Sequence, residues 1–164
     1  MSRPVLLVLA LAQENHEHKL SALADEVLYT GVGKVNAALH LTQKLAQMPV
    51  KPLVVNVGSA GSHSFDAGSV ICVTEFVQRD MDATAIGFHL GQTPFEPHAP
   101  LSNGLAVTGL AQATCYTGDS FVTEAHPHFH LEVIDMEAYA LAHVCQRLDV
   151  PFVCLKFITD GANG

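Results

Sequence analysis

The chain has 164 residues, of which 49% are hydrophobic and 15% charged, so it can form one folded domain over residues 1–164 and is not disordered. Eight Lys and Arg against sixteen Asp and Glu give a net charge of −8, which disfavours nucleic acid or an anionic membrane as a partner. No apolar run approaches the ~20 residues of a membrane span. Four scattered cysteines without a CxxC pair, and no clean export signal, predict reduced thiols in a cytoplasmic protein.

Apolar runs typical of buried strands alternate along the chain with segments of helical periodicity. Strands are expected at residues 5–11, 26–30, 53–57, 70–77, 133–134 and 151–158, with one or two more within 105–116. Helices are expected at 35–48 and 136–148, and the proline-rich stretch 87–103 is expected to form a loop. This alternation predicts an α/β fold in which helices flank a central mixed, largely parallel sheet.

Polar side chains follow several of the predicted strands at the point where each strand ends. In such sheets ligands bind at the carboxyl ends of the strands, so these side chains are expected to meet at one site. They are Glu14, Ser59, Asp119 and Asp160. A carboxylate such as Asp160, placed after a wholly apolar strand and before a glycine, is more often functional than decorative.

Two glycine-containing turns could bring backbone N–H groups close to a ligand. The sequence Gly31-Val32-Gly33-Lys34 lacks both the complete phosphate-loop pattern and the GxGxxG pattern, which favours a tight strand-to-helix turn over phosphate binding. The sequence Gly58-Ser59-Ala60-Gly61 is not a nucleophile elbow. It is compatible with either a ligand-binding turn or a simple one.

Alternating histidines occur at His16-Glu17-His18 and within residues 126–130. Neither run forms an HExxH pattern, and nothing in the sequence supplies a third ligand at suitable spacing. We therefore expect solvated loop histidines, no functional metal and no cofactor. The acidic residues of Asp135-Met136-Glu137-Ala138 suit the start of a helix, where the helix dipole favours negative charge.

Seven segments together resemble the nucleoside phosphorylase/nucleosidase superfamily, and within it the 5′-methylthioadenosine/S-adenosylhomocysteine nucleosidases. They occur in the family's order over nearly the whole chain, which is far more specific than any one match. The segments are ALAQE (10–14), GVGKVNAA (31–38), NVGSAG (56–61), RDMDATAIGF (79–88), GDSFV (118–122), DMEAYALAHV (135–144) and PFVCLKFITD (151–160).

The resemblance implies a role for each matching residue. Glu14 falls where the family keeps the carboxylate that activates water, and Asp160 where an acid meets N7 of the purine. Glu137 would hold the ribose hydroxyls. The remaining substrate-binding residues implied are Ser59, Ala60, Phe121, Val122, Met136 and Thr159, with Phe95 on a loop at 88–97 that covers the neighbouring subunit's site in a homodimer.

The reaction implied is hydrolysis of the N-glycosidic bond of an adenosine-type thionucleoside, which needs a general acid for the leaving base and a carboxylate that activates water. Two alternatives remain open: a phosphate-dependent phosphorylase and a non-catalytic protein that binds purine nucleosides. The presence of only three arginines disfavours the former, and the set of three carboxylates disfavours the latter. Against the family pattern, the chain is short, Lys156 stands where relatives often have Arg, and the family's C-terminal helix is expected to be missing.

Overall fold

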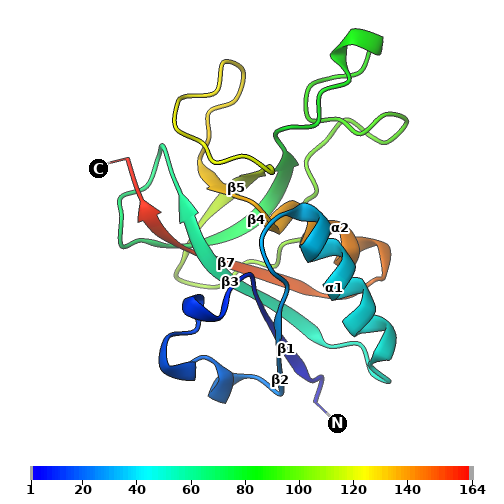
Figure 1. The fold of residues 1–164 in the computed structure, drawn as a ribbon, viewed down its shortest axis with the longest axis vertical. Coiled ribbons are helices and arrows are strands. Elements are labelled where there is room, and N and C mark those ends of the chain that lie inside the picture. Colours follow the sequence, from blue (N-terminus) through cyan, green and yellow to red (C-terminus); the bar gives the residue numbers. More distant parts are fainter. Residues whose placement is uncertain (1, 163–164) are drawn as a thin grey trace.

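Seven strands and two α-helices follow the order β-β-α-β-β-β-β-α-β in the computed structural model, which describes residues 2–162 (Figure 1). The elements are β1 (Val5–Leu9), β2 (Glu26–Tyr29), α1 (Lys34–Gln47), β3 (Leu53–Gly61), β4 (Val70–Gln78), β5 (Ala111–Thr117), β6 (Val133–Asp135), α2 (Ala138–Arg147) and β7 (Phe152–Asp160). None of the helices in these residues is long and apolar enough to cross a membrane.

All seven strands of the described residues belong to one sheet, in the order β2-β1-β3-β6-β5-β4-β7. Strand β7 also pairs with β3, so β3, β6, β5, β4 and β7 close into a ring from which β1 and β2 extend. Five pairings are parallel, and only β3–β6 and β4–β7 are antiparallel. The predicted mixed, largely parallel sheet is therefore confirmed.

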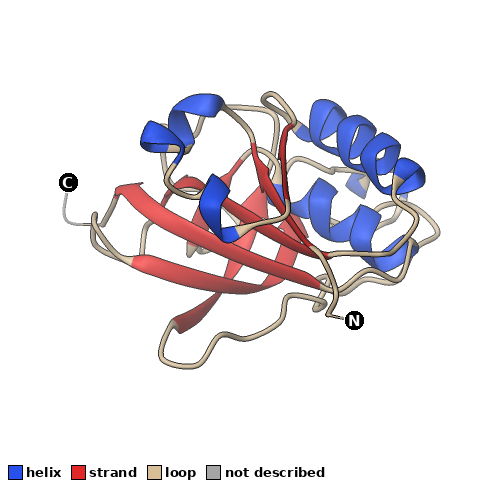
Figure 2. Cartoon of the chain, turned by 90° about the horizontal axis from the view of Figure 1, so that it is seen from below, coloured by secondary structure: helices blue, strands red, loops and turns tan. Residues whose placement is uncertain are grey.

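The two helices lie side by side against the sheet (Figure 2). Helix α1 buries Ala37 and Leu41, and α2 buries a broader apolar stripe that packs on the strands. Between the strands, the rings of Phe76 and Phe152 are fully buried, with their centroids 5.5 Å apart. Removing this apolar surface from water supplies most of the stabilisation of such a core.

The structure corrects two predicted boundaries and settles how many strands lie within residues 105–116. The strand expected at 53–57 continues through the predicted turn to Gly61, because β7 pairs with it in unbroken register from Val54 to Ala60 and, after a register shift, at Gly61. The helix expected at 136–148 begins only at Ala138. Within 105–116 there is one strand, β5, preceded by a loop.

The parallel strands β1, β3 and β7 position the site, because their carboxyl ends lie at the same edge of the sheet. A 3₁₀ turn after β1, Ala12–Glu14, brings Glu14 to this edge. Ser59 lies near the end of β3 and Asp160 is the last residue of β7. Of the four polar residues expected to meet, Glu14, Ser59 and Asp160 line one cavity, whereas Asp119 lies outside it, beside the start of α1.

Candidate active site

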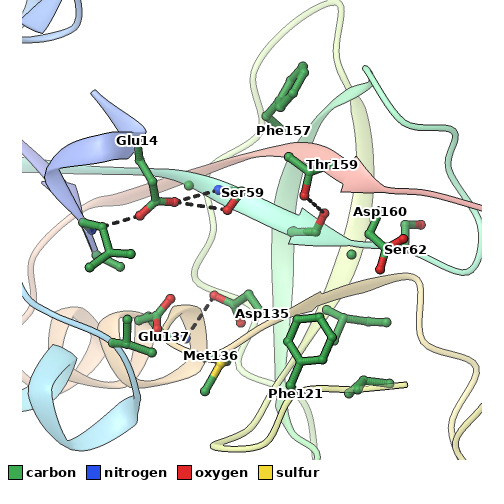
Figure 3. Close-up of a pocket in the computed structure, with 18 of the residues that line it drawn as sticks. Glu14, Ser59, Ser62, Phe121, Asp135, Met136, Glu137, Phe157, Thr159 and Asp160 are labelled. Carbon is green, nitrogen blue, oxygen red and sulfur yellow. Dashed lines mark hydrogen bonds between the residues drawn. The ribbon is translucent and has the colours of Figure 1, made fainter. Parts of the chain in front are cut away.

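A cavity of about 810 Å³ opens at this edge of the sheet (Figure 3). In Figure 3, Glu14 and Glu137 lie toward one end of it, and Phe121 and Asp160 toward the other. Its lining includes nine of the ten residues predicted for the site: Glu14, Ser59, Ala60, Phe121, Val122, Met136, Glu137, Thr159 and Asp160.

The Glu14 carboxylate is held in one orientation by hydrogen bonds from two segments. Its Oε1 accepts the Leu11 N–H at 3.0 Å, and its Oε2 accepts the Ser59 N–H at 2.8 Å. The Ser59 hydroxyl donates a longer bond of 3.4 Å to the same Oε2. Hydrogen bonds to a carboxylate are stronger than neutral ones, so Ser59 acts here by fixing Glu14.

Gly58 lets two charged side chains approach the strand closely, and a larger residue there would crowd them. A Cβ at this position would lie 3.1 Å from both Glu14 Oε2 and Lys156 Nζ. These atoms therefore occupy the space that a larger residue would fill. The glycine here serves close approach of a carboxylate and a cation to a strand, not the turn that the sequence suggested.

Lys156 and Asp135 form a buried ion pair beneath the cavity. Lys156 Nζ lies 3.1 Å from Asp135 Oδ2, and the two side chains are 2% and 1% exposed. Burial opposes the charged form of each, but the attraction between them prevails: the pKa of Asp135 is lowered and that of Lys156 is raised. Sequence reasoning noted Lys156 only as a departure from the family and missed this pairing.

Asp135 also fixes the start of α2, which explains why that helix begins later than predicted. Its Oδ2 accepts the N–H groups of Glu137 at 3.1 Å and Ala138 at 2.7 Å, and its Oδ1 accepts the Thr117 hydroxyl at 2.5 Å. These bonds satisfy the first amides of the helix and set where Glu137 stands. The signal in the sequence was an aspartate directly before the Met-Glu pair.

Glu137 is half-buried at the cavity wall, where its Oε2 accepts the Gly33 N–H at 2.8 Å. Burial, followed by repulsion from Asp135, raises its pKa from 4.5 to about 7. The group is thus poised between its neutral and charged forms near neutral pH. It can donate or accept a hydrogen bond toward the cavity.

The turn before α1 is occupied by carboxylates. The Gly33 N–H bonds Glu137, and the next amide, of Lys34, donates to Asp119 Oδ1 at 2.8 Å. Gly31 and Gly33 have φ values of 80° and 95°, which glycine adopts without strain. The predicted tight turn is therefore confirmed, and Asp119 serves to anchor the helix.

The far end of the cavity is more open. Phe121 is 79% exposed, and the side chain of Asp160, at the very end of β7, is also exposed. The Thr159 hydroxyl donates to the Ala60 carbonyl at 3.5 Å. This end therefore offers an aromatic face, a hydroxyl and an accessible carboxyl group to a ligand.

Phe95 is the one predicted site residue that does not line the cavity. It is 92% exposed and packs edge-to-face on Phe88, with the ring centroids 5.2 Å apart. In the part of the chain that the structure describes, no group of three or more His, Cys, Asp or Glu residues is placed to hold a metal ion. The expected absence of a functional metal stays a prediction.

Comparison with known proteins gives the family. The model of the phosphorylase superfamily matches residues 26–164. The chain belongs to this superfamily. It is 34% identical to the 5′-methylthioadenosine/S-adenosylhomocysteine nucleosidase of Haemophilus ducreyi, over 90% of this chain and 72% of that protein, and 35% identical to that of Staphylococcus carnosus, over 85% and 71%.

A solved structure of the same name agrees with this assignment. The nucleosidase of Neisseria meningitidis, in complex with methylthio-immucillin-A, superimposes with a TM-score of 0.83 at 26% identity, covering 98% of this chain and 87% of that one. The resemblance inferred from the seven segments is therefore confirmed. The chain spans about 70% of the length of the first two relatives.

The raised pKa of Glu137 predicts a pH-dependent stability. Because the folded state binds this proton more tightly than the unfolded state, stability falls as pH rises from about 4.5 to 7. In the wild type, this one group should lower the free energy of unfolding by about 3 kcal/mol between pH 4 and pH 8. Glu137→Gln cannot titrate at this position, so its free energy of unfolding should lack that decrease. Urea unfolding across this range measures it, with the exposed Glu17→Gln as control. An unchanged pH dependence in Glu137→Gln would contradict the assignment.

Proposed function

We propose that this protein hydrolyses the N-glycosidic bond of an adenosine-type thionucleoside, such as 5′-methylthioadenosine or S-adenosylhomocysteine, and releases adenine. The observation that carries the proposal is the Glu14 carboxylate, held by two backbone amides in the same cavity as Glu137 and Asp160. The names of its relatives support the substrate class.

In this mechanism Glu14 activates the attacking water. The bonds from Leu11 and Ser59 hold the carboxylate in one orientation, so it accepts a proton from water without first having to reorganise. The water adds to the anomeric carbon as the bond to the base breaks. Negative charge on Glu14 also stabilises the cationic character that the sugar develops in the transition state.

Glu137 and Met136 bind the sugar. Glu137, anchored through Gly33, accepts a hydrogen bond from a ribose hydroxyl, and Met136 packs on the ring. With a pKa of about 7, Glu137 is partly ionised in the free enzyme, and a cationic sugar favours its charged form. The same residue therefore contributes to binding and to the transition state.

Asp160 protonates the leaving base, which occupies the open end of the cavity. The aromatic face of Phe121 stacks on the purine, Val122 borders its edge, and Thr159 lies beside the acid. Protonation neutralises the negative charge that the purine acquires as the bond breaks. No cofactor enters this scheme.

The two alternatives are less compatible with the site. A phosphorylase must bind a dianion, but the amides before α1 are taken by Glu137 and Asp119, and the cavity carries three carboxylates. A protein that only binds nucleosides has no need for a fixed Glu14 together with an acid at the other end.

The four cysteines are free and buried, which supports the reducing cytoplasm as the location of the protein.

Product analysis tests the reaction class. The purified protein, incubated with 5′-methylthioadenosine in phosphate-free buffer, should release adenine and the free thioribose, and added phosphate should leave the rate unchanged. Chromatography of both products makes the measurement. A requirement for phosphate, with formation of a sugar 1-phosphate, would show a phosphorylase instead, and binding without turnover would show a binding protein.

Asp160→Asn should lower kcat by at least ~100-fold, because general acid catalysis contributes about 10²–10⁴-fold. Substrate affinity should largely persist, since the amide keeps the shape and one hydrogen-bond donor. Steady-state kinetics and direct binding separate the two effects. Asp149→Asn, at the other end of β7, is the matched control and should behave as the wild type. Near-normal kcat in Asp160→Asn would remove Asp160 from the mechanism.

We also propose that the protein acts as a homodimer in which the loop at residues 88–97 covers the neighbour's site. Phe95 is almost fully exposed, and α1 presents the exposed apolar residues Val35 and Leu39 to solvent. Light scattering at micromolar concentration should give twice the mass of the chain, and Phe95→Ala should raise KM. A monomer with full activity would contradict this assembly.

A further inference from the structure

Arg79, directly after β4, is a buried cation to which neither the mechanism nor the family resemblance assigns a role. Arg79 is only 6% exposed, and within residues 2–162 its guanidinium forms no ion pair with a carboxylate. A buried charge is costly unless it is well hydrogen-bonded. Its bonding partners therefore indicate what it is for.

The guanidinium donates all its bonds to one short stretch of backbone and one hydroxyl within it. Nε bonds the Tyr116 carbonyl at 3.2 Å, and Nη2 bonds the carbonyls of Gly118 at 3.3 Å and Ser120 at 2.6 Å. Nη1 bonds the Ser120 hydroxyl at 3.1 Å. The backbone from 116 to 120 thus curls around a single planar cation.

Gly118 makes this arrangement possible. A Cβ on Gly118 would lie 2.7 Å from both Cζ and Nη1 of Arg79, which is closer than atoms approach. The Arg79 amide also donates to the Thr117 carbonyl at 2.9 Å, so both the backbone and the side chain of this residue bind the turn. The glycine and the arginine therefore form one structural unit.

The turn leads directly into the residues that receive the base. From Phe121 to Ala125 the described structure has no regular secondary structure and no backbone hydrogen bond. Phe121 is largely exposed, so packing does not fix it. The last firmly held point before Phe121 and Val122 is Ser120, and Arg79 holds it.

We propose that Arg79 is the positioning residue for the base-binding segment, through its forked donation to the turn at 118–120. The inference rests on the proposed function, because it assumes that Phe121 and Val122 bind the purine. The planar fork is essential to it. A lysine keeps the charge, but its three donors radiate from one nitrogen, whereas the acceptors here are bonded from three nitrogens of a planar fork.

The test compares Arg79→Lys and Arg79→Met with the wild type and with Arg3→Met, an exposed arginine at the amino end of β1. Three quantities are measured: KM and kcat for 5′-methylthioadenosine, the Kd of free adenine, and hydrogen exchange of residues 116–125 in the free protein. Both Arg79 variants should raise KM and the adenine Kd by about 10-fold or more, because charged hydrogen bonds to the turn are lost.

The kcat of both variants should change less than KM, because the segment holds the base in the ground state and the transition state alike. Hydrogen exchange should rise at 116–125 and stay unchanged in the core strands, which separates local loosening from unfolding. Wild-type KM and adenine affinity in Arg79→Lys, or unchanged exchange at 116–125, would overturn the inference. If the wild type neither cleaves nucleosides nor binds adenine, the proposed function fails and takes this inference with it.

Discussion

The ion pair between Lys156 and Asp135 connects the parts of the molecule on which the site depends. Lys156 lies on β7, and Asp135 ends β6, caps α2 and accepts the Thr117 hydroxyl of β5. Removing one partner of such a pair leaves a buried, uncompensated charge, at a typical cost of about 3–5 kcal/mol. The pair therefore ties the closed ring of strands to the start of α2, which Glu137 directly precedes, and it brings a positive charge close to the carboxylates of the cavity.

That charge makes the acidic site possible. Glu14 Oε2 and Lys156 Nζ each lie 3.1 Å from the position that a Cβ on Gly58 would take, and Asp135 contacts the same ammonium. Asp135 in turn repels Glu137 and helps to raise its pKa to about 7, whereas Glu14 is bonded to two amides. Carboxylates that line one cavity are thus given different environments, which suits the different roles proposed for them, Glu14 as the base and Glu137 as the sugar-binding group.

Local pattern predicted much of this arrangement, and long-range pairing accounts for the rest. Continuous apolar runs identified the strands, and the rule that ligands bind at their carboxyl ends brought Glu14, Ser59 and Asp160 together. The turn predicted at residues 58–61 failed because pairing with β7 outweighs the local preference of glycine and serine. Arg79 and the partners of Lys156 were not predictable, because their contacts join residues about 20 to 40 positions apart and leave no spacing to recognise.

The hydrogen-bond donors and cations around the site are already bound to groups of the protein, which favours water over phosphate as the nucleophile. The amides of Gly33 and Lys34 bind Glu137 and Asp119, and the amide of Ser59 binds Glu14. Among residues 2–162, Arg79 is the one Lys or Arg that lines the cavity, and it donates its hydrogen bonds to the turn before Phe121. Lys156, beneath the cavity, is paired with Asp135. A phosphate dianion would have to displace these carboxylates or lie among them unneutralised, whereas a neutral water needs only the one acceptor that Glu14 provides.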